Sequence, residues 1–272
     1  MEYIISMGKD IIKKRRLIGD LAKADFRKRF VGSYFGVVWM FVQPIVTVLI
    51  YYFVFGVGLR SGSPVEGVPY VLWLVSGIVP WFYFSEVLNA GTNCLSEYSY
   101  LVKKVVFRVE ILPIIKILSC LIIHAIFILI MVGLHLCFGW APRISWFQMI
   151  YYSFAETMFA MGIVYFTSAI QVFFKDMAQI VGICLQFGMW LIPIMWQEEQ
   201  FAGRSYYPVV QAVVKLNPMY YVMTGYRDSM LLGNGFWEKP RQTLYFWAVT
   251  LCVGFVGLKV FKRLRPHFSD VL

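Results

Sequence analysis

The chain has 272 residues, of which 60% are hydrophobic and only 15% are charged. Soluble domains carry about 25% charged residues, so this composition excludes an ordinary soluble protein and indicates an integral membrane protein. The net charge of +10 would suggest nucleic-acid binding in a soluble chain, but here the basic residues lie between apolar runs, where membrane topology accounts for them. We therefore predict no nucleic-acid partner.

The first predicted element is a basic amphipathic helix over residues 1–30. Residues 13–30 contain eight Lys or Arg and two acids, whereas residues 31–59 contain no charge. Apolar residues such as Ile18 and Phe26 recur at helical spacing on one side of a wheel, and most basic residues fall on the other. Such a helix tends to lie in the membrane interface rather than cross the membrane. Anchoring of a flexible tail by positive charge is the alternative.

Long apolar runs follow this helix in a predicted permease domain over residues 31–272. A transmembrane helix needs about 20 apolar residues. Runs of this order predict six spans, at 30–59, 67–85, 117–142, 144–174, 177–197 and 242–258. The predicted fold class is therefore an all-α membrane protein.

The segment 198–241, between the fifth and sixth spans, contains two apolar pieces that are each too short to cross a membrane. Pro208 and Pro218 punctuate these pieces. Short helices at membrane depth are tolerated against protein or a water-filled cavity, so we expect re-entrant helices here. A folded outer cap is the alternative.

The distribution of Lys and Arg orients the six spans. With the amino terminus inside, 18 Lys and Arg residues fall on the cytoplasmic side and seven fall outside. Because cytoplasmic loops carry the excess of basic residues, both termini, including the tail 259–272, are predicted to be cytoplasmic.

Sequence motifs for bond chemistry are absent. The chain has no HExxH, no GxSxG, no paired Cys/His cluster and no GxxxxGK[ST] phosphate loop, so any ATP that drives it is hydrolysed on another chain. Glu86 and Glu156 fall in or beside apolar runs, where an acid either contacts substrate or bonds to a neighbouring helix. Both alternatives stay open. A glycan enzyme would need paired catalytic carboxylates, but the adjacent acids Glu198 and Glu199 have no nucleophile near them in sequence.

Five blocks together carry a resemblance to a known family. They read ADFRKRFVGSYFGVVWMFVQPI, LVKKVVFRVEILPI, VFFKDMAQIVGICLQFGMWLIPIMW, LNPMYYVMTGYRDSML and FKRLRPHFSDVL, and they span nearly the whole chain. In content, order and spacing they resemble the membrane subunit of bacterial ABC exporters of polysaccharides and polyol phosphates, which include the O-antigen, capsule and teichoic acid export permeases. One departure is Phe107-Arg108, where the family usually has Phe-Pro. It puts in doubt the turn geometry of that loop.

The resemblance implies a homodimer of this chain with two copies of a separate ATP-binding cassette ATPase. ATP and magnesium would then be bound by that partner, and this chain would carry no cofactor and no metal. The resemblance also implies that a coupling loop at 92–112 contains the helix that docks into the ATPase. The residues implied in this coupling are Glu97, Tyr98, Lys103, Lys104, Arg108 and Glu110.

The family's substrates are glycans carried on a polyprenyl diphosphate lipid. Arg27, Lys28 and Arg29 stand at the level where that head group would meet the inner leaflet, and arginine binds phosphate with two parallel hydrogen bonds. Attraction to anionic membrane lipid, about 1 kcal/mol per basic residue, would yield the same composition.

By the same resemblance, spans one and five would line the conduit. The implied lining residues are the aromatic side chains Tyr34, Trp39, Phe41, Trp190 and Trp196. Rings that face lipid or pack in the protein are the alternative.

The predicted function is that of the transmembrane subunit of an ABC transporter, which exports a lipid-linked polysaccharide of O-antigen type across the bacterial inner membrane. Capsule or teichoic acid export is the nearest alternative. An ion-coupled secondary transporter is a different class, and it would usually show more midplane charge and internal repeats than this sequence does.

Overall fold

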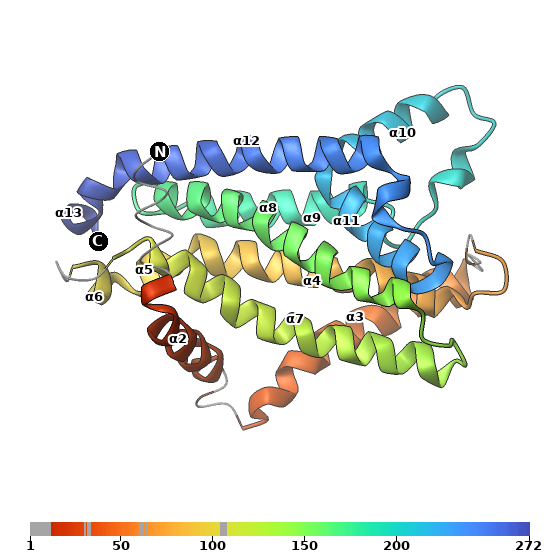
Figure 1. Cartoon of the computed structure of the whole chain (residues 1–272), viewed down its shortest axis with the longest axis horizontal. Helices are drawn as coiled ribbons and strands as arrows, with labels where there is room; N and C mark the ends of the chain where they lie inside the picture. The colour runs from red at the N-terminus through yellow and green to blue at the C-terminus, as the bar shows by residue number, and fades with distance from the viewer. Residues whose placement is uncertain (1–11, 30, 32–33, 60–62, 64, 104–107) are drawn as a thin grey trace.

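The structure is a computed structural model, and it describes residues 12–29, 31, 34–59, 63, 65–103 and 108–272. Every regular element in these residues is helical, which confirms the predicted all-α class. Figure 1 shows long helices lying side by side along the longest axis of the molecule.

The helices of the bundle are α2 (Arg15–Lys28), α3 (Trp39–Tyr51), α4 (Tyr70–Thr92), α7 (Ile111–Cys137), α8 (Gln148–Gln171), α9 (Met177–Leu191), α10 (Tyr207–Leu216), α11 (Pro218–Arg227) and α12 (Pro240–Leu264). Shorter helical segments are η1 (Gly36–Val38), η2 (Tyr52–Gly58), α5 (Cys94–Glu97), α6 (Ser99–Val102), η3 (Ile144–Phe147), η4 (Glu198–Phe201), η5 (Asp228–Leu232), η6 (Phe236–Glu238), η7 (Arg265–His267) and α13 (Phe268–Val271). Figure 1 places α2, α5, α6 and α13 at one end, here called the α2 end, and α10 at the other, here called the α10 end.

Five helical segments of the described residues are long and apolar enough to cross a membrane. They are Gly36–Gly58, Tyr70–Thr92, Ile111–Cys137, Ile144–Gln171 and Pro240–Val271. The protein is therefore a multi-pass membrane protein. The run predicted as a fifth span, 177–197, corresponds to α9, which is apolar but only 15 residues long. At 1.5 Å per residue α9 covers about 22 Å, less than the hydrocarbon core of about 30 Å, so the count of six spans stays a prediction.

Helix α2 packs across α7 at the α2 end through the residues that its amphipathic pattern predicted. Ile18 and Ala22 are buried, and so is Asp25, one helical turn farther along. The basic side chains Lys23 and Arg27 stay exposed. The remainder of the predicted helix, residues 1–11, lies outside the described residues, and its place at the membrane interface stays a prediction.

The core of the bundle is α4, which is enclosed by α7, α8, α9 and α11. Its apolar window is 78% buried. Helices α8 and α12 cross at glycines: a Cβ placed on Gly257 would lie 2.1 Å from the carbonyl oxygen of Gly162, and a Cβ on Gly162 would lie 2.8 Å from the backbone nitrogen of Gly254. Only glycine permits such close backbone contact.

The first apolar segment, Gly36–Gly58, differs from α4 in its packing. Its window is only 6% buried, and large apolar side chains such as Leu49 and Phe53 are exposed along it. Pro44 lies inside α3. This segment therefore presents most of its surface to the surroundings of the single chain.

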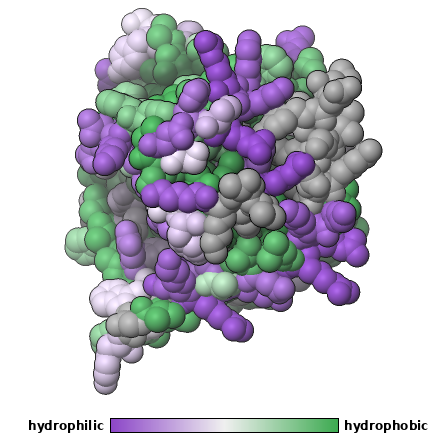
Figure 2. Space-filling view, turned by 90° about the vertical axis from the view of Figure 1, so that its left-hand side faces the viewer, coloured by the Kyte–Doolittle hydropathy of each residue, from purple (hydrophilic) through white to green (hydrophobic). Residues whose placement is uncertain are grey.

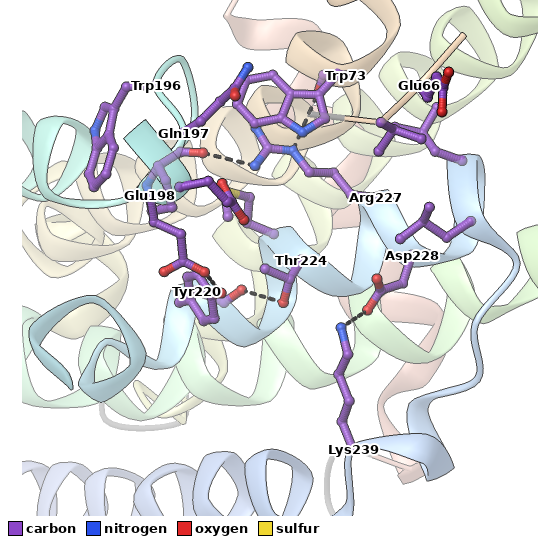
Figure 3. A pocket seen from close by; sticks show the side chains of 16 residues that line it. Glu66, Trp73, Trp196, Gln197, Glu198, Tyr220, Thr224, Arg227, Asp228 and Lys239 are labelled. Carbon is purple, nitrogen blue, oxygen red and sulfur yellow. Dashed lines mark hydrogen bonds and ion pairs between the residues drawn. The ribbon is translucent and has the colours of Figure 1, made fainter. Parts of the chain in front are cut away.

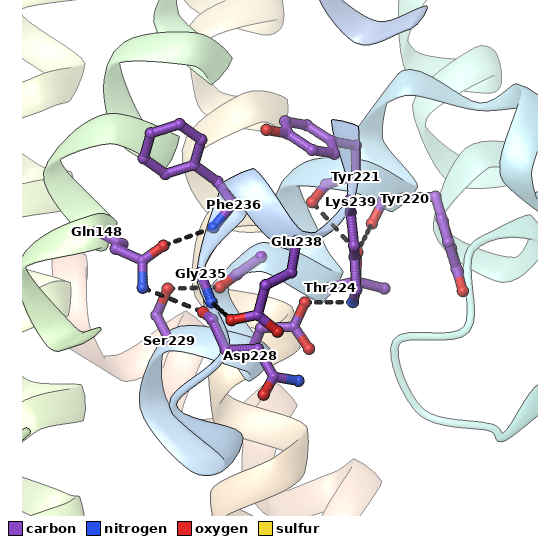
Figure 4. Close-up of polar contacts among 12 residues, drawn as sticks. Gln148, Tyr220, Tyr221, Thr224, Asp228, Ser229, Gly235, Phe236, Glu238 and Lys239 are labelled. Carbon is purple, nitrogen blue, oxygen red and sulfur yellow. Dashed lines mark hydrogen bonds and ion pairs between the residues drawn. The ribbon is translucent and has the colours of Figure 1, made fainter. Parts of the chain in front are cut away.

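The α10 end is organised by prolines and by polar contacts. Pro218 opens α11, and the side chain of Asn217 caps that helix by accepting a hydrogen bond from the backbone of Met219 at 3.0 Å. After α11, the side chain of Gln148 holds the segment 228–239 by bonding to the backbones of Asn234 and Phe236 (Figure 4). Helices α10 and α11 are short, as expected, and their re-entrant character stays a prediction.

Candidate functional site

A buried carboxylate anchors α2 at the α2 end. Asp25 is 3% exposed, and its Oδ1 accepts hydrogen bonds from Lys116 Nζ at 2.7 Å and from the Tyr98 hydroxyl at 2.6 Å. Lys116 also donates to Glu97 at 2.6 Å. Burial raises the pKa of the Asp25 carboxyl, but the bonds from Lys116 and Tyr98 outweigh it and leave that pKa below 3.8. Asp25 is therefore ionised at neutral pH.

Arg29 lies beside this carboxylate and reaches across to α4 and α7. Its guanidinium is ion-paired and hydrogen-bonded with Glu86, lies 3.7 Å from Asp25 and donates to Cys120 Sγ at 3.2 Å. The Arg29 side chain is 19% exposed and that of Glu86 is 46% exposed. Glu86, whose role the sequence left open, thus bonds to a neighbouring helix.

Arg29 and Glu86 line a pocket of about 440 Å³ between α3, α4 and α7, here called the α3–α4–α7 pocket. Polar side chains on its walls include Gln43, Asn89 and His124, and its apolar wall includes Trp39 and Phe127. A single cation beside polar groups and rings can hold an anionic head group that is attached to an apolar or sugar moiety.

The other two predicted head-group residues lie outside this pocket. Arg27 and Lys28 are exposed on α2, where they border a shallow surface depression with Lys23. Figure 2 looks onto the α2 end and shows hydrophilic side chains gathered over it, with apolar side chains between them. Arg27 and Lys28 are therefore next to Arg29 in the chain, but they do not share its cavity.

The predicted conduit aromatics are not brought together in the single chain. Tyr34 is 97% exposed, Trp39 is 54% exposed and Trp190 is 55% exposed. Phe41 is half-buried, with its ring centroid 6.1 Å from that of Phe127. Trp196 lines a different pocket at the α10 end. Their role in a conduit stays a prediction.

The predicted coupling residues divide between surface and interior. Glu97 and Tyr98 face the Asp25 network, as described above, and Lys103 is exposed at the end of α6. Glu110 is 2% exposed and lies 2.5 Å from the tail residue Arg265. Arg108 is half-buried, and Lys104 lies outside the described residues.

A second pocket, here called the α10-end pocket, has a volume of about 480 Å³ (Figure 3). Arg227 is one of its lining residues. The guanidinium is 3.5 Å from the centroid of the Trp73 ring and donates to the carbonyls of Trp73 at 3.2 Å, Pro193 at 2.8 Å and Ile194 at 2.6 Å. Next to it, Asp228 is ion-paired with Lys239.

Sequence reasoning missed Arg227 by counting it with the charges of an outer loop. The structure buries it to 8% exposure and uses it to tie the end of α9 to α4 and α11. One feature of the sequence that could have pointed to this contact is Gly77, a glycine inside an apolar run. A Cβ there would lie 2.6 Å from Arg227 Nη2, so a larger residue would displace the guanidinium. A glycine inside a helix often marks such a close approach.

Comparison of the sequence with known proteins places the chain in a family. The model of the ABC-2 type transporter family matches residues 17–231, from α2 to η5. An O-antigen export system permease protein RfbA of Klebsiella pneumoniae is 24% identical, over 93% of each chain. A protein of the same name from Myxococcus xanthus is 25% identical, over 98% of this chain and 99% of its own length. Because the family model covers most of the chain, this protein belongs to the ABC-2 type transporter family of membrane permeases.

Proposed function

We propose that this chain is the membrane permease of an ABC exporter that moves a lipid-linked polysaccharide of O-antigen type across the bacterial inner membrane. The observation that carries the proposal is the similarity to O-antigen export permeases over nearly the whole length of both chains. In this proposal the chain crosses the membrane six times, and both termini and the α2 end lie in the cytoplasm. The 18 Lys and Arg residues on that side support this orientation.

The working unit in this proposal contains two copies of the chain. One observation that supports a dimer is the poor burial of the first apolar segment, Gly36–Gly58. Its polar residues Gln43 and Thr47 line the α3–α4–α7 pocket. Helix α9 likewise exposes Phe187 and Trp190. A second copy that covers α3 and α9 would enclose a passage between the two chains, with Trp39 and Trp190 among its lining residues.

Two ATPase subunits would drive this unit from the cytoplasm, because the chain itself carries no phosphate loop. ATP and magnesium would be bound there. Helices α5 and α6 would provide the docking surface, and Lys103 is exposed on it. The ion pairs from Lys116 to Glu97 and Asp25 connect that surface to α2, so a displacement of α5 would be transmitted to the Arg29 region.

The diphosphate head group of the lipid carrier would bind at Arg29, after meeting Arg27 and Lys28 at the surface of α2. Phosphate can replace the half-exposed carboxylate of Glu86, because both offer oxygens to the same planar guanidinium. Attraction of these residues to ordinary anionic lipid is the competing explanation. Binding of an anionic phospholipid, which carries charge but no diphosphate, separates the two explanations.

Capsule and teichoic acid export share this machinery. The names of the similar proteins favour O-antigen export. An ion-coupled secondary transporter is disfavoured by membership of the ABC-2 family.

The test is deletion of the gene in its own host, followed by localisation of the lipid-linked glycan. We expect the glycan to accumulate on the cytoplasmic face, and we expect export to return with the wild-type chain only when a functional ATPase is present. Export that continues in the deletion strain, or that needs no ATPase, would contradict the proposal.

A further inference from the structure

The α10-end pocket has the size of a small-molecule site but no assigned role. Its volume of about 480 Å³ falls within the range of about 300–1,000 Å³ that is usual for ligand pockets. Side chains converge on it from the loop before α4, from the segment around η4, from α11 and from Lys239. In Figure 3, Trp196, Glu198 and Tyr220 lie on one side of it, and Glu66 and Asp228 lie on the other.

The charges of this pocket exclude an anionic ligand. Four carboxylates line it, those of Glu66, Glu198, Glu199 and Asp228. Its two cationic side chains are already engaged, since Arg227 donates to three backbone carbonyls and Lys239 is paired with Asp228. A phosphate or carboxylate entering the pocket would therefore meet like charge without a compensating donor.

A metal ion also does not fit. In the described part of the chain, no group of three or more His, Cys, Asp or Glu side chains could hold one. In Figure 3 the carboxylate of Glu198 lies on one side of the pocket, and those of Glu66 and Asp228 lie on the other. This spacing suits a ligand that offers several hydrogen-bond donors in different directions.

Hydroxyl groups on a ring are such donors. Glu198 accepts from the Tyr220 hydroxyl through Oε1 at 3.0 Å, whereas its Oε2 is buried and has no hydrogen-bond partner among the described residues, so a ligand hydroxyl reaches it once the side chain rotates toward the cavity. A carboxylate oxygen takes a hydroxyl hydrogen in a short, charge-assisted bond. On the same side, the half-buried indole of Trp196 lines the pocket, and the π-face of an indole can stack on the C–H groups of a sugar ring, which carry partial positive charge.

We propose that the α10-end pocket binds an uncharged sugar unit, with Glu198 accepting hydroxyl hydrogens and Trp196 forming the stacking wall. This inference rests on the proposed function, in which the α10 end lies on the outer side of the membrane. There the pocket would hold a sugar of the emerging glycan. Arg227 and Trp73 keep the pocket open by fixing the end of α9 against α4.

The experiment is saturation-transfer NMR on the purified full-length chain in lipid nanodiscs. Nanodiscs are used because the head group of a maltoside detergent is itself a sugar. The probes are the methyl glycosides of glucose, galactose, mannose and rhamnose. We expect transfer to at least one probe, with an affinity about tenfold weaker in Glu198→Gln, which keeps an oxygen for Tyr220 but replaces the other acceptor by a donor.

Two matched controls lie at the same end of the bundle but outside the pocket. Glu238 accepts a hydrogen bond from the backbone of Gly235 at 2.8 Å, a bond that Glu238→Gln can keep, and Trp237 is 66% exposed. We expect Trp196→Ala to weaken sugar binding, and we expect Glu238→Gln and Trp237→Ala to leave it unchanged.

Absence of transfer to all four probes would overturn the proposal, and so would transfer that both Glu198→Gln and Trp196→Ala leave intact. The proposed function has a separate readout, which is export in cells. Sugar binding by a chain that exports no glycan would refute that function and leave this site standing. Export by a chain whose pocket binds none of the probes would refute the site alone.

Discussion

Each end of the bundle encloses an arginine beside a pocket, but the two arginines have different partners. At the α2 end, Arg29 and Lys116 are paired with the carboxylates of Glu86, Asp25 and Glu97. At the α10 end, Arg227 is held by backbone carbonyls and by the face of Trp73. Glu86 and Glu97 are half-exposed, with 46% of each side chain accessible, whereas Arg227 is buried.

This difference separates exchangeable contacts from fixed ones. A carboxylate on a half-exposed side chain can rotate away and give its place to another anion at little cost, because exposed ion pairs contribute only about 0–1 kcal/mol. A backbone carbonyl can leave Arg227 only if the chain that carries it moves. The α2 end is therefore suited to binding and release, and the α10 end is suited to holding the end of α9 in place.

Replacement of Arg227 should have the largest effect on stability. Arg227→Ala removes the side-chain donor of three backbone carbonyls, two of which, at Pro193 and Ile194, lie outside the helices, and we expect a loss of about 3 kcal/mol in the free energy of unfolding. The measurement is thermal unfolding of the purified chain. Arg204→Ala, which alters an exposed arginine of the same end, should leave the transition unchanged. Equal stability of the two variants would contradict the role of Arg227 in holding the end of α9 in place.

A methyl group added beside the Arg227 guanidinium should also lower the stability of the fold, by less than the loss of Arg227 does. In Gly77→Ala the new Cβ would lie 2.6 Å from Arg227 Nη2, and we expect a loss of about 1–3 kcal/mol from overpacking. In Gly133→Ala, inside α7, nothing lies within 4 Å of the new atom. This control should be neutral or slightly stabilising. Unfolding curves of the two variants that coincide would contradict the close packing.

Loss of charge at position 29 should affect ligand binding more than folding. If Arg29 binds the diphosphate of the lipid carrier, Arg29→Gln should weaken binding of a polyprenyl diphosphate about tenfold, with unchanged assembly of the complex. Glu86→Gln should tighten binding, because it removes the competing carboxylate. Arg16→Gln changes an exposed arginine of α2 and is the control. Binding to an ordinary anionic phospholipid should not respond, and a matching response there would indicate general attraction to anionic lipid.

Acid should loosen α2 slightly, through Asp25. The pKa of this carboxyl is lower in the folded chain than its ordinary value of 3.8, so its contribution to stability is present above that value and is lost as the pH falls below it. We expect the protection factors of the α2 amides, which are exchange rates corrected for the intrinsic effect of pH, to fall between about pH 5 and pH 3 by more than in Asp25→Asn, which has no proton to gain there. Asp20→Asn, on the exposed face of α2, should retain the wild-type response.

Patterns along the chain predicted the helices better than they predicted the contacts between them. Runs with no charge or a single charge located all five long apolar segments of the described residues, and the wheel of α2 placed Ile18 on the buried side. The partners of Arg29 could not be predicted in this way, because Glu86 lies 57 residues away and Cys120 lies 91 residues away. No local periodicity encodes such a pairing.

The same limit applied to the α10 end. Arg227 was counted as a loop charge because it lies in the segment 198–241, between the fifth and sixth predicted spans. Its carbonyl partners at Pro193 and Ile194 belong to the run that was predicted as the fifth span. Helix α9 ends at Leu191, ahead of Pro193, so the apolar run 177–197 is longer than the helix that it contains. Hydropathy measures composition and does not register this break.

The glycine contact between α8 and α12 restricts how the molecule can change shape. With the carbonyl of Gly162 so close to Gly257 that a methyl group does not fit between them, sliding or rotation of one helix would drive backbone into backbone. We therefore expect α8 and α12 to move together as a rigid body. The distance between a spin label on α8 and one on α12 should stay the same in every stage of a transport cycle. This pair of helices can then serve as a fixed reference for measuring the movement of α2 and α3.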